Sequence, residues 1–70
     1  MVVTYHAGER FLQRVFNFTN YSKKQVLNAM KLIQKDISNI STSRSRFVLP
    51  TFPDFIGVKV EDKLVTIIPK

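Results

Sequence analysis

The segment that most constrains the fold runs from Ser22 to Ser38, because it carries both the start signal and the apolar stripe of a helix. Ser22-Lys23-Lys24-Gln25 is a capping box, in which the first and last side chains satisfy each other's free backbone amides. Apolar residues then recur at steps of three and four, namely Val26, Met30, Ile33 and Ile37. The pattern predicts an amphipathic helix that reaches to about Ser38.

An earlier helix is expected from about Tyr5 to Phe18, preceded by a short strand at residues 2–5. Thr4 can serve as its N-cap, and Thr19-Asn20 is expected to end it. Gly8 is a weak spot near its start that costs little in the first turn. The side of this helix that faces the core is predicted to carry Phe11, Leu12, Val15 and Phe18.

The second half of the chain alternates strand and turn signals. Strands are predicted at residues 46–49, 55–60 and 64–68, after a flexible polar connection at residues 39–45. If the last turn is Glu61-Asp62, Val58 opposes Val65 and Ile56 opposes Ile67; a longer turn gives other pairs. The predicted class is α+β, a single domain over residues 1–70 with one short strand, two helices, and a three-stranded antiparallel sheet packed on the helices.

Composition narrows the class of protein. Hydrophobic residues make up 44% of the 70 residues, which favours a packed globule over a disordered tail. The chain has no cysteine, which excludes a disulfide scaffold and a thiolate zinc site. No signal peptide and no apolar run of membrane-spanning length is visible, so we expect a cytoplasmic protein with no membrane partner.

The charge balance points to a polyanionic partner. Eleven Lys and Arg against five Asp and Glu give a net charge of +6 and a pI near 10.1, which favours RNA or another nucleic acid. Phe52, beside the prolines of its loop, is the aromatic residue expected to be most exposed for base stacking. The candidate nucleic-acid-binding residues are Lys24, Lys31, Lys35, Arg44, Arg46 and Lys59.

The first helix carries the residues with the clearest chemistry. His6, Arg10 and Arg14 follow at steps of four and form a shallow spiral along one face. No metal-ligand spacing and no phosphate-binding glycine loop is present, so no metal and no cofactor is expected. These residues suit metal-free attack of an RNA 2′-hydroxyl on the neighbouring phosphate, with His6 transferring a proton and the arginines holding phosphate charge.

The run His6-Ala7-x-x-Arg10-x-x-x-Arg14, with strands ending in Val65-Thr66-Ile67-Ile68, resembles small RelE-like proteins. The resemblance covers nearly the whole chain in element order, and it implies metal-independent RNA cleavage by a toxin that an antitoxin holds in check. By position, it implies catalytic roles for His6, Arg10, Arg14 and Thr66.

Two other interpretations stay open at this point. The chain can be a non-catalytic nucleic-acid-binding or regulatory module of plasmid or phage type, or an adaptor that meets an acidic protein. The expected edge strand at residues 46–49 can also pair with a partner or with a second copy to form a homodimer.

Overall fold

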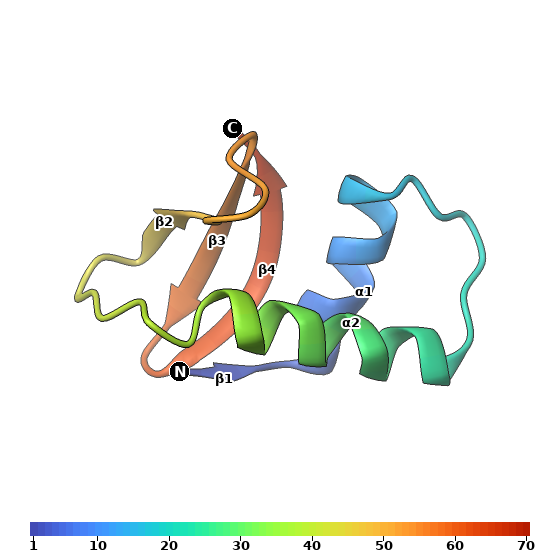
Figure 1. Cartoon of the computed structure of the whole chain (residues 1–70), viewed down its shortest axis with the longest axis horizontal. Helices are drawn as coiled ribbons and strands as arrows, with labels where there is room; N and C mark the ends of the chain where they lie inside the picture. The colour runs from blue at the N-terminus through green and yellow to red at the C-terminus, as the bar shows by residue number, and fades with distance from the viewer.

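The computed structural model describes all residues from 1 to 70 and confirms the α+β class (Figure 1). In chain order the elements are β1 (Val2–Val3), α1 (Tyr5–Val15), α2 (Lys23–Asp36), β2 (Arg46–Val48), β3 (Phe55–Val60) and β4 (Lys63–Pro69).

Thr4 connects the start of α1 to the sheet. Its side-chain oxygen accepts a hydrogen bond from the Ala7 amide at 3.2 Å, which confirms the predicted N-cap. The same hydroxyl donates to the Leu64 carbonyl at 2.8 Å. One side chain therefore both caps α1 and fixes that helix against β4.

The end of α1 differs from the prediction. The helix stops at Val15, and Asn17 has a φ of 59°, in the left-handed region that Asn tolerates better than most residues. The Phe18 amide then donates to the Leu12 carbonyl at 3.0 Å, which closes the helix end. Asn17, rather than Thr19-Asn20, is the terminator, and Phe18 leaves the helix and is exposed.

The prediction for α2 is confirmed. Both hydrogen bonds of the capping box between Ser22 and Gln25 are formed, and three residues of the predicted stripe are buried: Val26, Ile33 and Ile37. The helix ends at Asp36, two residues before the expected end, with Ile37 as its C-cap.

The sheet has four strands in the order β1-β4-β3-β2 rather than the three expected. β2, β3 and β4 are antiparallel neighbours, as predicted, but β1 pairs in parallel with the start of β4. The short Val2–Val3 segment therefore completes the sheet, which makes it mixed.

The β3–β4 hairpin has the predicted two-residue turn but a shifted register. Val60 pairs with Lys63, and Glu61 adopts a φ of 55° in the turn. A β-bulge beside Val58 then moves the partner of that residue from the expected Val65 to Thr66.

The bulge also decides which β4 residues enter the core. Leu64 and Ile67 are both fully buried, although the unbroken register would place them on opposite faces. The bulge adds one extra residue to β4, and this residue places Ile67 on the same face of the sheet as Leu64. The pairs expected for a two-residue turn, Val58 with Val65 and Ile56 with Ile67, are therefore not formed, and Ile56 pairs with Ile68 instead.

Both helices contribute to one core with β4 and Leu49. Phe52 packs against this core instead of lying exposed, with its ring 5.1 Å from the Phe11 ring in an edge-on arrangement. A large aromatic ring is more stable inside such a small domain than in its solvent-facing loop.

Gly8 marks the closest approach of the two helices. A Cβ at this position would lie 2.7 Å from Met30 Cγ and 3.1 Å from the Val26 carbonyl oxygen. The prediction that Gly8 is only a weak spot missed this contact, since the glycine lets α2 pack directly on the α1 backbone.

Candidate functional site

The candidate site lies on the outward face of α1. His6, Glu9, Arg10 and Gln13 follow at steps of three and four, so they share one side of the helix. We call these four residues the α1 polar face. None of the four is among the buried residues of the chain.

A chain of hydrogen bonds joins this face to the loop that follows α1. Arg10 Nη1 donates to Gln13 Oε1 at 2.6 Å, and Gln13 Nε2 donates to Tyr21 Oη at 2.8 Å. Tyr21 Oη in turn donates to Glu9 Oε2 at 3.0 Å. This Tyr21 network, made of Glu9, Arg10, Gln13 and Tyr21, fixes the carboxylate and the guanidinium relative to each other before any ligand binds.

His6 stands beside the network. Its Nδ1 lies 4.0 Å from Glu9 Oε1, and 54% of its side chain is exposed. A carboxylate at this distance can orient the imidazole ring. The ring is therefore both accessible to a ligand and close to a group that can share in proton transfer.

The Tyr21 hydroxyl is held in its protonated form. Partial loss of solvent around the hydroxyl, followed by its hydrogen bond to Glu9 and the charge of Glu9, raises the pKa of Tyr21 above its ordinary value of 10.0. Tyr21 therefore remains a hydrogen-bond donor to Glu9 at neutral pH.

Arg14 is engaged elsewhere. Its Nη1 donates to the Ile67 carbonyl at 2.5 Å, on the side of β4 away from β3. β1 pairs only with Lys63 and Leu64, so this part of the β4 edge has no strand beside it. Arg14 covers a backbone acceptor on an open edge and thereby connects α1 to the sheet.

Thr66 does not join the other residues expected at the site. It precedes the fully buried Ile67 on β4, so its side chain points to the opposite face of the sheet. It pairs with Val58 on β3. The structure therefore brings together His6 and Arg10, holds Arg14 against the strand edge, and leaves Thr66 apart.

The predicted nucleic-acid-binding residues fall into two groups. Five of them are exposed, namely Lys24, Lys31 and Lys35 on α2 and Arg44 and Arg46 before and in β2. Lys59 is half-buried and donates from Nζ to the Thr42 carbonyl at 2.6 Å, which ties the 39–45 connection to β3.

The positive charge of the chain is not neutralised internally. The structure holds one ion pair, between the Met1 amine and Asp62, and a His6–Glu9 contact that is an ion pair only when the imidazole is protonated. None of the eleven Lys and Arg side chains pairs with a carboxylate, although Arg10, Arg14 and Lys59 donate hydrogen bonds to neutral acceptors of the chain.

Sequence reasoning missed the part that Glu9 and Tyr21 play. Glu9 carried a signal, because it lies three residues after His6 and shares its helix face. Tyr21 carried no such signal, because its hydroxyl bonds to residues of α1 that lie 8 and 12 positions away in the sequence. Its hydroxyl reaches α1 because the loop folds back after Asn17.

No family model matches the chain, and no curated protein or solved structure was found that is similar to it. The RelE-like resemblance stays a prediction. Neither helix is long and apolar enough to cross a membrane.

Proposed function

We propose that this protein binds RNA and cleaves it without a metal ion, using His6 and Glu9 of the α1 polar face. The observation that carries the proposal is the exposed His6 imidazole, 4.0 Å from a Glu9 carboxylate that Tyr21 fixes in place. A proton-transfer pair of this kind, beside a guanidinium, is what metal-free phosphoryl transfer needs.

The proposed reaction has two proton transfers. The Glu9 carboxylate takes the proton of the RNA 2′-hydroxyl as that oxygen bonds to the neighbouring phosphorus. The bond from phosphorus to the 5′ oxygen breaks, and protonated His6 donates its proton to the leaving oxygen. The products are a 2′,3′-cyclic phosphate and a 5′-hydroxyl end, so atoms and charge balance without any other reagent.

Arg10 is the proposed contact for the negative charge of the reacting phosphate. Its guanidinium has five N–H donors, and the structure records one hydrogen bond from it, to Gln13. That bond orients the group while leaving donors for phosphate oxygens. Arg14 serves instead as a positioning residue, because it joins α1 to β4 through the Ile67 carbonyl.

RNA binding rests on the unpaired basic side chains. The α2 lysines and Arg44 and Arg46 lie outside the Tyr21 network, and they supply contacts to the phosphate backbone beyond the reacting bond.

The same observation favours a second candidate function, a nucleic-acid-binding module without catalysis. In that case the Tyr21 network is only a device that fixes the loop after α1. Both functions predict binding that weakens steeply with salt, and product formation separates them.

The experiment is incubation of the purified protein with mixed RNA in EDTA, followed by analysis of the fragment ends. His6→Gln and Glu9→Gln are compared with the native chain, and Lys63→Gln, which removes one exposed charge on β4, is the control. We expect 2′,3′-cyclic ends, a loss of about 100-fold or more in both α1 variants, and little change in the control.

A parallel reaction in a translation extract covers cleavage that requires a ribosome. Absence of fragments in both settings, with salt-sensitive RNA binding retained, would refute the catalytic proposal in favour of the binding module.

A further inference from the structure

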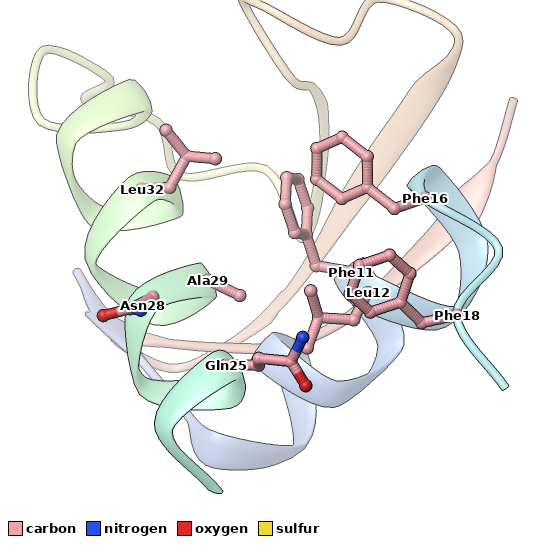
Figure 2. A pocket seen from close by; sticks show the side chains of 8 residues that line it. All are labelled: Phe11, Leu12, Phe16, Phe18, Gln25, Asn28, Ala29 and Leu32. Atoms are coloured by element: carbon pink, nitrogen blue, oxygen red, sulfur yellow. The ribbon is translucent and has the colours of Figure 1, made fainter. Parts of the chain in front are cut away.

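An apolar groove opens between α1 and α2 (Figure 2). It encloses about 280 Å³, and the hydrophobic residues that line it are Phe11, Leu12, Phe16, Phe18, Ala29 and Leu32. We call it the α1–α2 groove. Three of its side chains are unusually exposed for their size: Phe16 at 46%, Leu32 at 44% and Phe18 at 37%.

The groove exists because α1 ends early. After Val15 the chain turns at Asn17, and Phe16 and Phe18 project beside the groove instead of continuing the buried side of the helix. The Phe16 ring packs edge-on against the Phe11 ring at 5.3 Å and lies 6.2 Å from the Phe18 ring. These contacts hold the wall of the groove in shape without a ligand.

The groove continues along α2 toward the loop before β3. A second hollow of about 300 Å³ shares Leu32 with the first and is also lined by Phe52 and Lys35. Together the two hollows extend along α2 from Gln25 to Asp36. At 1.5 Å per residue this length is about 16 Å, or about three turns of a helix laid alongside.

Basic side chains line the outer edge of the groove. Viewed down the axis of α2, Lys24, Lys31 and Lys35 lie next to the groove-lining Asn28, on its outer side. None of these lysines has an acidic partner. The one carboxylate at the groove, that of Asp36, is already bonded to the amide and hydroxyl of Thr51. The surroundings of the groove are therefore positive.

We propose that the α1–α2 groove binds an acidic amphipathic helix of a partner protein. Leucine or phenylalanine side chains of that helix fill the two hollows, and its carboxylates meet Lys24, Lys31 and Lys35. The proposal follows from the elongated apolar shape and from the complementary charge.

An RNA base fits the lining less well. A base carries polar edges that need hydrogen bonds, whereas the walls are mainly hydrocarbon. Of the two polar lining residues, Gln25 uses its Oε1 in the capping box, and Asn28 points away from the aromatic rings (Figure 2). The groove therefore suits an aliphatic or aromatic side chain of a protein.

The groove is separate from the α1 polar face to which cleavage is assigned, although both proposals use Lys24, Lys31 and Lys35. Leu12 in the groove and Arg10 on the polar face are two residues apart, about 200° around α1, so they face nearly opposite directions. The binding test below uses no RNA cleavage readout, and its failure would leave the proposed function unaffected.

The probe is a capped synthetic helix of about 18 residues, with leucines at steps of three and four and glutamates elsewhere. It is titrated into the ¹⁵N-labelled protein at low salt. A peptide of the same composition with the leucine spacing scrambled, and one with lysines in place of the glutamates, are the controls. We expect saturable shifts at groove residues with the acidic amphipathic peptide and much weaker effects with both controls.

Matched variants locate the site. Leu32→Asp is expected to weaken peptide binding at least tenfold, whereas Leu27→Asp, at a residue of nearly equal exposure (42%) that does not line the groove, changes it less than twofold. Changing Lys24, Lys31 and Lys35 to Gln together is expected to weaken binding at least fivefold and to flatten its salt dependence.

Three results would overturn the proposal. The first is absence of saturable binding by the acidic peptide, and the second is equal binding by the Leu32→Asp and Leu27→Asp variants. The third is occupation of the groove by another ligand. An RNA oligonucleotide that shifts the Phe16, Phe18 and Leu32 signals would assign the groove to base stacking, and self-association that only Leu32→Asp abolishes would assign it to a second copy.

Discussion

Replacing Gly8 by alanine tests the packing that holds α1 and α2 together. In an exposed helix interior, Gly→Ala stabilises by about 1 kcal/mol, because alanine has the higher helix propensity. At Gly8 the added methyl group would meet Met30 Cγ at 2.7 Å and the Val26 carbonyl oxygen at 3.1 Å. The sign of the effect therefore depends on whether α2 can give way.

The two contacts differ in how easily they relax. Met30 can change rotamer, although its Cγ lies near the backbone and moves less freely than its terminal methyl group. The Val26 carbonyl belongs to the α2 backbone and can move only with the helix. Overpacking of this kind costs about 1–3 kcal/mol. Against the gain of about 1 kcal/mol, the expected result is net destabilisation by about 1 kcal/mol, or a fall in Tm of about 4–8 °C for a domain of this size.

Thermal unfolding followed by circular dichroism measures this change. A double-mutant cycle with Met30→Ala isolates the contact, because the smaller side chain makes room for the new methyl group. We expect Gly8→Ala to cost at least about 0.5 kcal/mol less in the Met30→Ala background than in the native one. A rise in Tm for Gly8→Ala alone, or strict additivity in the cycle, would show that the helices do not meet at this point.

Three further predictions concern the α1 region. The raised pKa of Tyr21 predicts that its phenolate, followed by ultraviolet absorbance, forms at higher pH than the ordinary tyrosine value of 10.0, and that Glu9→Gln reduces the difference. Because the folded chain binds this proton more tightly, the associated stability is present below pH 10 and is lost as pH rises through the folded-state pKa. Asn17→Gly is expected to leave Tm nearly unchanged, whereas Asn17→Val, which disfavours a φ of 59°, should cost about 1–2 kcal/mol; equal effects would contradict the left-handed turn. Arg14→Gln should lower the unfolding free energy by about 1–2 kcal/mol through loss of the bond to the Ile67 carbonyl, and an unchanged Tm would remove its positioning role.

The sequence predicted those parts of the fold that depend on neighbouring residues. The Ser22 capping box and the stripe from Val26 to Ile37 specify α2 locally, and Thr4 caps α1 as expected. Each of these signals acts within one or two helical turns. Sequence pattern alone was therefore sufficient for them.

Features that depend on contacts across the fold were not predicted. The bulge beside Val58 lets Leu64 and Ile67 both enter the core. No pattern within the hairpin sequence predicts that both residues are buried. The close approach at Gly8 depends likewise on residues of α2 that lie more than fifteen positions away.

The candidate site shows the same division. The spacing of His6 and Arg10 along a helix is sufficient to predict that both residues share one face. The position of Arg14 at the strand edge depends on where β4 lies, and the role of Tyr21 depends on how its loop folds back. Spacing along a helix can predict which residues share a face. It cannot predict which of those side chains will be bound by other parts of the fold.

The central claim is that this protein cleaves RNA through its 2′-hydroxyl with proton transfer by His6. The most direct measurement uses one RNA strand with a mapped cleavage position and the same strand with a single 2′-deoxy nucleotide there, both in EDTA. The account predicts cleavage of the first strand to a 2′,3′-cyclic phosphate, no cleavage at the modified position of the second, and equal binding of both. Cleavage at the modified position, or failure to cleave either strand while binding both, would contradict it.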